Sequence, residues 1–384
     1  MVRKSYIIEK KSVFLPKNIK QSGPAKHPDM SLKKQTSTLI IALLIATAGC
    51  TNEETNAVKN QPVATAKTSN SEKDSAKIKL LQTFSGFSKI DEVIITPDGQ
   101  RAIGASDNVN IWNIATGQLL QSLEINTNID SLAIHPNGKM LAIGRWDGTI
   151  ELWDIIVGKR LAAISGHTMD INALIFTPDG KSLISGSEDG FLFIWDLTAG
   201  KLDRTLIDKT QNRQYLSSIN AATLSEDGNT LVSTDDNSIK IWDYQTGKIE
   251  RTIKDSEKFQ KGIKSIDISS DGKTLAGATP DLLLVWDLDS ENETNIDIKN
   301  TLDYKPTSIT SIAINPNGKT LATGFPNGKI ALWDLQTKQP ILKEIQHSID
   351  PTAAVQTLAY NTNGTLLISG SADGIIKIWQ IKPF

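Results

Sequence analysis

The chain has 384 residues, of which 39% are hydrophobic and 22% are charged, a composition typical of a soluble globular protein. Nine Lys/Arg and two Asp/Glu fall in residues 1–50, so residues 51–384 hold 32 basic against 41 acidic residues. That balance disfavours a nucleic-acid partner, because binding phosphates requires clustered basic charge. The single cysteine, Cys50, excludes an internal disulfide framework and a cysteine-rich metal site, and we expect neither a metal nor a cofactor.

The segment that precedes Cys50 is typical of a secretory signal. Residues 39–46, LIIALLIA, form an apolar run that is too short to span a membrane, for which a helix needs about 20 residues. Two lysines precede the run and the small residues 47–49 follow it, in the order found in signal peptides. A complete signal begins at Met30, so we interpret residues 1–29 as a gene-model extension or a disordered segment.

The end of this signal, TAGC at residues 47–50, resembles the lipobox of bacterial lipoproteins. The resemblance implies that residues 30–49 are removed and that Cys50 carries lipid. The protein would then be anchored to a membrane of the bacterial envelope, facing the periplasm or the exterior. Thr47 departs from the pattern, because that family usually has an aliphatic residue there. The alternatives are an incidental cysteine after an ordinary signal, and a cytosolic protein that does not use the signal.

Residues 51–77 are predicted to be a disordered tether between Cys50 and the rest of the chain. The segment lacks aromatic residues and helical periodicity, and it is rich in Ser, Thr, Asn, Lys and Glu. It therefore has too little apolar surface to offset the entropy of ordering. A flexible coil of this length has an end-to-end distance of roughly 30 Å.

The remainder, residues 78–384, is a repeat marked by tryptophans 41 to 47 residues apart: Trp112, Trp153, Trp195, Trp242, Trp286, Trp333 and Trp379. Each unit is predicted to form four short strands, as in NALIF, SLISGS, FLFIWDL and KLDRTLI of the third unit, separated by PDG, EDG and TAG turns. Units of this length with a GH…WD signature resemble the WD-repeat β-propeller family. The resemblance implies an all-β fold of seven four-stranded antiparallel blades, which we expect to be monomeric.

The order of strands at the two ends predicts how the ring closes. KIKLLQTF, residues 77–84, has the character of a fourth strand but precedes the first unit, whereas the seventh unit has only three strands. We therefore predict that this N-terminal strand completes the last blade, which removes an open sheet edge.

Two units carry the hydrogen-bonded set of His, Ser, Asp and Trp that the resemblance implies inside a blade. The residues are His167, Ser185, Asp189 and Trp195 in the third unit and His347, Ser369, Asp373 and Trp379 in the seventh. The first three of each set also invite interpretation as a hydrolase triad, but a triad needs an exposed nucleophile and an oxyanion pocket. Because other units lose members of the set, we interpret it as structural support.

The units differ in length mainly in the segment between each unit tryptophan and the next turn glycine. The family resemblance implies that the loops in this segment lie on one face of the propeller, the top face, together with the Asp-containing turns. Aromatic residues and arginine dominate interface hot spots. The candidate partner-binding residues on this face are Arg145, Trp146, Tyr215, Phe259, Tyr304 and Phe325.

These observations predict a membrane-tethered, non-catalytic scaffold that binds protein or peptide partners on the top face. The alternatives are a hydrolase-type enzyme acting in the central channel and a cytosolic WD-repeat scaffold. A hydrolase would need convergent acids, bases or a metal in the channel, and the sequence contains no motif for such a cluster.

Overall fold

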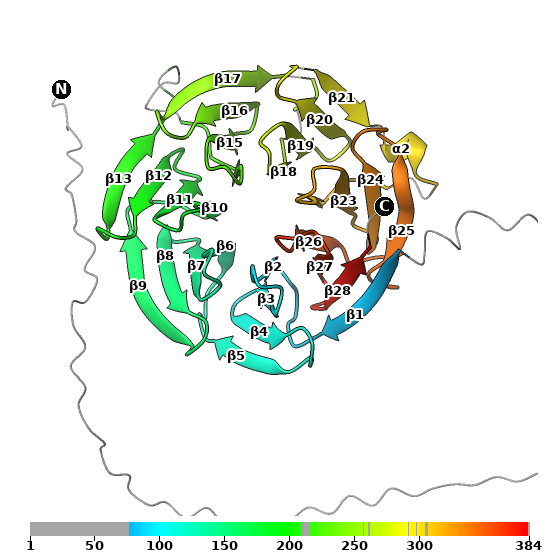
Figure 1. Ribbon diagram of the computed structural model, residues 1–384, viewed down its shortest axis with the longest axis horizontal. Helices are drawn as coiled ribbons and strands as arrows, with labels where there is room; N and C mark the ends of the chain where they lie inside the picture. Colours follow the sequence, from blue (N-terminus) through cyan, green and yellow to red (C-terminus); the bar gives the residue numbers. More distant parts are fainter. Residues whose placement is uncertain are drawn as a thin grey trace, which may run out of the picture. The chain divides into compact units, whose positions relative to one another are not determined.

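The computed structural model describes residues 77–382, except 209, 211–215, 256, 260–261, 291, 297 and 304–305. The predicted extension, signal and Cys50 lie outside the described residues, as do the tether up to residue 76, Tyr215 and Tyr304. The described residues form seven four-stranded antiparallel sheets arranged as blades around a ring (Figure 1). The predicted seven-bladed β-propeller is therefore confirmed.

In blades 1 to 6 the four strands are arranged in chain order from the centre of the ring to its circumference, and in blade 7 the order is β26, β27, β28 and then β1 (Figure 1). Their bounds, by blade, are β2 (Glu92–Ile95), β3 (Arg101–Ala105), β4 (Val109–Asn113) and β5 (Leu119–Leu123) in blade 1; β6 (Ile129–Ile134), β7 (Met140–Arg145), β8 (Thr149–Asp154) and β9 (Lys159–Ser165) in blade 2; β10 (Ile171–Phe176), β11 (Ser182–Ser187), β12 (Leu192–Asp196) and β13 (Lys201–Leu206) in blade 3; and β14 (Ala221–Leu224), β15 (Thr230–Thr234), β16 (Ser238–Asp243) and β17 (Lys248–Lys254) in blade 4.

The other three blades follow the same plan. Their bounds are β18 (Ser265–Ile268), β19 (Thr274–Ala278), β20 (Leu283–Asp287) and β21 (Glu293–Ile296) in blade 5; β22 (Ser311–Ile314), β23 (Thr320–Gly324), β24 (Lys329–Asp334) and β25 (Pro340–Gln346) in blade 6; and β26 (Val355–Tyr360), β27 (Leu366–Ser371), β28 (Ile376–Ile381) and β1 (Ile78–Phe84) in blade 7. A single short helix, α2 (Ile298–Thr301), lies between blades 5 and 6 in the described part of the chain.

Tight turns set the strand boundaries, as the PDG turn between β10 and β11 illustrates. Asp179 accepts hydrogen bonds from the Thr177 hydroxyl at 2.7 Å and from the Lys181 N–H at 3.0 Å. Gly180 then takes φ +68°, a conformation in which glycine has no Cβ clash. The same residue types recur at this place in other units, so the repeat in sequence becomes a repeat of hairpins.

Strand β1 completes blade 7, as predicted. It pairs antiparallel with β28, with Ile78 opposite Ile381 and Phe84 opposite Ile376, and the sheet order is β1-β28-β27-β26. Phe84 is 4% exposed, and its ring stacks on the Trp112 indole of blade 1 at 5.1 Å between centroids. The N-terminal strand therefore fills the last blade and also joins it to the first.

Apolar residues fill the spaces between neighbouring blades. One cluster combines Leu283 of blade 5 with Trp333 of blade 6, and another combines Ile376 of blade 7 with Trp112 of blade 1. Six of the seven unit tryptophans are at most 6% exposed; Trp153 is the half-buried exception. In the described residues, no helix is both long enough and apolar enough to cross a membrane.

Candidate partner-binding surface

The four predicted members of the blade 3 set form one hydrogen-bonded chain. The Trp195 Nε1–H donates to Ser185 Oγ at 2.8 Å, Ser185 Oγ lies 2.8 Å from His167 Nε2, and His167 Nδ1 lies 2.9 Å from an Asp189 carboxylate oxygen. Burial opposes ionisation of Asp189, but hydrogen bonds from His167 and from backbone N–H groups outweigh it and hold the Asp189 pKa below its usual value. Ser185 is fully buried, so its hydroxyl is not an exposed nucleophile.

Blade 7 links only three of its four predicted members. Trp379 Nε1–H donates to Ser369 Oγ at 2.8 Å, and His347 Nδ1 lies 2.7 Å from the same hydroxyl. Asp373 instead accepts the N–H of Ile375 at 3.1 Å, so the interpretation that placed Asp373 in a hydrogen bond with His347 is corrected. Burial, followed by the positive charge of Lys377, lowers the His347 pKa to about 4, so this imidazole is neutral at physiological pH.

In blade 2 a different set of hydrogen bonds holds the unit tryptophan, and Arg145 is part of this set. Ile143 stands where blade 3 has its serine, and the Trp153 Nε1–H donates to buried Glu151 at 2.8 Å. The other Glu151 oxygen accepts hydrogen bonds from Arg145 at 3.0 Å and from Arg160 at 2.9 Å. Arg145 therefore neutralises a buried carboxylate within its own blade, a role that we did not predict.

Blade 4 also contains a buried charged residue, in this case Lys240. Ser233 accepts the Trp242 Nε1–H at 2.9 Å, and the buried Lys240 forms ion pairs with Asp235 and with Asp208, the latter at 3.8 Å. Glu151 and Lys240 both stand two residues before the unit tryptophan. This position is apolar in blades 3, 5 and 6 (Phe193, Leu284 and Ala331) but is Asn110 in blade 1 and Lys377 in blade 7, so a charged residue there was only a partial sequence signal for these charge clusters.

Two of the aromatic binding candidates are buried, contrary to prediction. Phe259 is 1% exposed and packs edge-to-face on the Trp286 indole at 6.5 Å, and Phe325 is fully buried in the core between blades 5 and 6. In blade 5, Gly277 stands at the hydroxyl position and an added Cβ would lie 2.9 Å from Trp286. The loop that carries Phe259 therefore covers the end of a blade that has no hydrogen-bonded set.

Trp146, in contrast, is an exposed aromatic residue on the top face. Its side chain is 53% exposed, while its Nε1–H donates to Thr127 Oγ1 at 2.8 Å, which fixes the indole. Its turn packs against the next inter-blade loop, because a Cβ on Gly148 would lie 2.6 Å from the carbonyl oxygen of His167 and 3.2 Å from that of Met169. Met169 on that loop is 46% exposed, so two large apolar side chains are held on adjacent loops.

Carboxylates gather where the inner strands of blades 1 to 3 begin, and one of them, Asp170, directly follows Met169 in the chain. Asp91, Asp130, Asp170 and Glu188 form this acidic crescent, in which Lys89 makes an ion pair with Asp91 at 3.0 Å. Burial, followed by the negative charges of the other three, raises the Asp130 pKa to about 6. In the described ranges, no group of His, Cys, Asp or Glu is arranged to hold a metal ion. The crescent is a concentration of negative charge, which includes Asp170 next to Met169.

Glu92, the first residue of β2, follows Asp91 of the crescent. Its carboxylate accepts the N–H of Leu132 at 2.6 Å, across the junction of blades 1 and 2. Burial, partly offset by this hydrogen bond and reinforced by the negative charges of Asp130 and Asp91, raises the Glu92 pKa to about 8. Glu92 therefore contributes to packing between blades and carries a proton over much of the physiological pH range.

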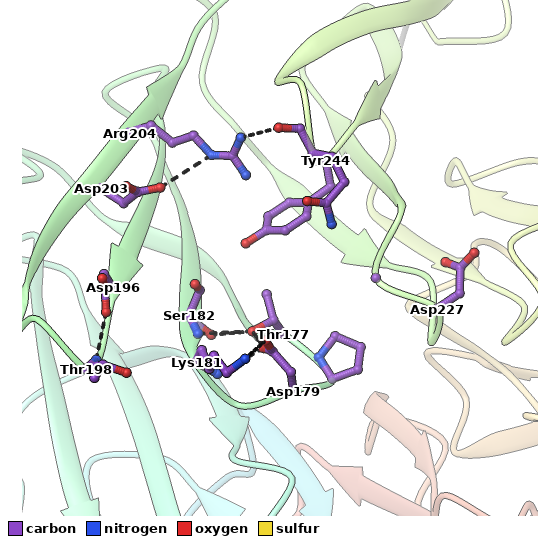
Figure 2. A pocket seen from close by; sticks show the side chains of 13 residues that line it. Thr177, Asp179, Lys181, Ser182, Asp196, Thr198, Asp203, Arg204, Asp227 and Tyr244 are labelled. Atoms are coloured by element: carbon purple, nitrogen blue, oxygen red, sulfur yellow. Dashed lines mark hydrogen bonds and ion pairs between the residues drawn. The ribbon is translucent and has the colours of Figure 1, made fainter.

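An open cleft of about 520 Å³ lies on the opposite face, between blades 3 and 4 (Figure 2). Arg204 reaches across it to donate to the Gln245 carbonyl at 2.7 Å and lies 4.9 Å from the centre of the Tyr244 ring. Two of its carboxylates stabilise turns, because Asp179 accepts a hydrogen bond from the Thr177 hydroxyl and Asp227 accepts one from the Ser225 hydroxyl. Of these polar groups, Arg204 joins blades 3 and 4, and Asp179 and Asp227 each stabilise a turn within one blade.

Comparison with known proteins agrees with the fold. Two β-propeller family models match consecutive parts of the chain: the nucleolar protein 10-like N-terminal domain at residues 101–271 and the Vps8 β-propeller at residues 277–383. The chain is 34% identical over 80 residues to Periodic tryptophan protein 2 homolog of Schizosaccharomyces pombe, which covers 19% of this chain and 9% of that protein.

Two other relatives match segments of similar length. WD repeat-containing protein VIP3 of Arabidopsis thaliana is 33% identical over 82 residues, 18% of this chain and 26% of that protein. Anaphase-promoting complex subunit cdh1 of Dictyostelium discoideum is 31% identical over 74 residues, 18% of this chain and 10% of that protein. The chain thus spans only 9% to 26% of the length of the three relatives. The tryptophan repeat, the seven blades and these matches together support a WD-repeat β-propeller.

Proposed function

We propose that the protein is a non-catalytic scaffold, tethered to a bacterial envelope membrane through lipid on Cys50, that binds a protein or peptide partner on its top face. The observation that carries the binding proposal is Trp146, which is half exposed yet fixed by a hydrogen bond. An aromatic side chain held in this way loses little entropy when a partner covers it. Trp146, with Met169, forms the apolar centre of the proposed site.

The charge around this centre defines the class of partner. The acidic crescent includes Asp170, which is next to the exposed Met169 in the chain, so a partner segment that carries Lys or Arg next to an apolar side chain is the complementary ligand. One relative is named as a subunit of a multiprotein complex, which favours protein binding by analogy. The His–Ser–Asp set of blade 3 is used internally, and this supports a scaffold over a hydrolase.

The binding proposal is tested by crosslinking in living cells, identification of the partner by mass spectrometry, and measurement of its affinity for purified variants. Trp146→Ala should weaken binding by about 2 kcal/mol, or roughly 30-fold in Kd. Ile349→Gln, which changes a 95% exposed side chain on another loop, should leave affinity unchanged. Equal affinities of Trp146→Ala and the parent would place the site elsewhere.

The anchor is tested separately by incorporation of labelled fatty acid. The parent should be labelled and Cys50→Ser should not, because the chain has no other thiol. Labelling of both proteins, or of neither, would contradict the lipoprotein proposal.

A further inference from the structure

Most of the exposed large apolar side chains lie on one arc of the circumference. Ten such side chains occur in the described residues, and seven of them are on the outermost strands of blades 7, 1 and 2 or on a turn leading to one of these strands. These strands, β1, β5 and β9, follow one another along the lower arc of the ring (Figure 1). We name the seven residues the leucine edge: Leu80, Leu81, Leu119, Leu120, Ile156, Val157 and Leu161.

The register of the strands places three of these leucines at equivalent positions. In β1, β5 and β9, one residue bulges out of the ladder near the unit tryptophan. Two consecutive residues of the neighbouring strand pair with two residues of the outer strand that are not consecutive, so the residue between them has no partner in the ladder. The skipped residues are Leu81 in blade 7, Leu120 in blade 1 and Leu161 in blade 2. At the same bulge, blades 3 and 4 have the exposed Asp203 and Glu250, and blade 6 has Ile341, which is partly buried. The fold therefore projects this residue from blades 7, 1, 2, 3 and 4, and the residue type differs between these blades.

The outer strands of blades 7, 1 and 2 also differ from the other outer strands in their charged residues. Strands β1, β5 and β9 contain Lys79, Lys159 and Arg160 and no Asp or Glu. The four other outer strands each carry a carboxylate, at Asp203, Glu250, Glu293 and Glu344, and three of them also carry basic residues, such as Lys201, Lys248 and Lys343. The strands of the leucine edge thus combine apolar and basic side chains without a carboxylate, whereas every other outer strand has at least one acidic group. Apolar insertion together with attraction between basic side chains and anionic headgroups is the chemistry of interfacial membrane binding.

An apolar groove continues the edge beyond Leu161. It has a volume of about 150 Å³ and lies between blades 2 and 3, lined by Met140, Leu161, Trp195 and Leu197 among others. The covalent order of the chain points to the same edge, because 27 residues separate the proposed lipid on Cys50 from β1, and β1 is itself part of the edge. A chain held at a membrane through Cys50 leads directly into this arc.

We infer that the leucine edge is a membrane-docking surface, whose occupant is a bilayer that contains anionic lipid. The inference rests on the proposed membrane tether and adds an orientation to it, with the propeller lying on its edge. The circumference is convex, and β5 lies between β1 and β9 on it (Figure 1). The middle strand therefore enters a flat bilayer most deeply, with its exposed side chains Leu119 and Leu120. The acidic crescent on the top face then remains open to a partner.

The experiment measures flotation of the lipid-free propeller with vesicles. Every strand pairing lies within residues 78–381, so a fragment of residues 51–384 carries the whole ring while lacking both Cys50 and the apolar run of residues 39–46. It should float with vesicles that contain phosphatidylglycerol, less so at high salt, and hardly at all with vesicles of phosphatidylcholine alone. Leu120→Gln should lower the partition coefficient about tenfold, and Leu119→Gln with Leu120→Gln should lower it further.

Ile349→Gln is the matched control, because it removes an even more exposed apolar side chain from a loop away from the edge. It should leave flotation unchanged. Leu120 has no partner in the ladder, so its substitution should leave the melting temperature nearly unchanged, and Leu161→Gln repeats the test in another blade. If the fragment does not float with phosphatidylglycerol, or if the leucine variants float as well as the parent, the inference fails.

A protein occupant would give a different result. If sedimentation shows a dimer that Leu120→Gln dissociates, while vesicles do not bind, the edge is an interface between two copies and the inference is again wrong. Because the fragment lacks Cys50, its flotation is independent of the fatty-acid labelling that tests the anchor. The two proposals can therefore fail separately.

Discussion

Substitution of Phe84 by alanine tests whether β1 seals the ring. Phe84 is 4% exposed, stacks on Trp112 at 5.1 Å and belongs to the cluster that joins blades 7 and 1. Removal of a buried phenylalanine side chain loses its transfer free energy and leaves a cavity, so Phe84→Ala should lower the free energy of unfolding by about 3–5 kcal/mol. The measurement is urea unfolding of the 51–384 fragment, followed by tryptophan fluorescence.

Leu81→Ala is the control in the same strand. Leu81 is 36% exposed and bulges out of the ladder, so its truncation should change the free energy of unfolding by less than about 1 kcal/mol. Deletion of residues 78–84 should destabilise the ring more than either substitution, because a whole ladder with β28 is lost. If Phe84→Ala and Leu81→Ala unfold at the same urea concentration, β1 does not hold the closure that we describe.

The remaining predictions concern the blades and the acidic crescent. His167→Ala leaves Ser185 and Asp189 short of a partner and should lower stability by about 1–3 kcal/mol in thermal unfolding, while the folded fraction keeps its partner affinity. The Glu92 pKa is raised from 4.5 to about 8, so its ionisation destabilises the fold as pH rises through this window. Glu92→Gln should therefore be more stable than the parent by about 1–3 kcal/mol at pH 8 and no more stable near pH 5; an equal difference at both pH values would refute the assignment. Binding of a basic partner should weaken as pH falls through about 6, where Asp130 takes up a proton, and Asp130→Asn should abolish that dependence.

The sequence predicted the architecture because its signals are local and repeated. Tight turns such as PDG, with a glycine at positive φ, mark hairpins, and the unit tryptophan recurs at one place in each blade. The extra strand before the first unit predicted the closure, and the pairing of β1 with β28 confirms it. These features depend on neighbours along the chain, so they were visible before the strands were assembled.

The binding candidates were harder to predict because exposure depends on how the loops fold. An aromatic residue in an inserted loop can face solvent or cover a blade, and Phe259 covers the Trp286 indole. Arg145 was predicted from its position in a turn, but its side chain bonds Glu151 on the next strand. Trp146 differs in being fixed by Thr127 with half of its surface exposed.

The leucine edge was not predicted, because the bulge that exposes it is a property of register. In sequence, Leu120 is one of two adjacent leucines in a strand and has no feature that distinguishes it from a core residue. Only the pairing of Trp112 with Leu119 and of Ile111 with Gln121 shows that Leu120 leaves the ladder. Comparison with Asp203 and Glu250 at the same bulge, and with the partly buried Ile341 of blade 6, then shows that an exposed apolar residue at this bulge occurs in blades 7, 1 and 2.

The central claim, that the top face beside Trp146 binds a basic partner, is tested most directly by a photoreactive amino acid placed at residue 168, an exposed position next to Met169, in living cells. A discrete adduct with one protein should form from residue 168 and not from Thr205 on the outer strand β13, and it should be lost when Asp130 and Asp170 are changed to Asn. No adduct from residue 168, or an adduct that persists after the acidic crescent is neutralised, would contradict the account.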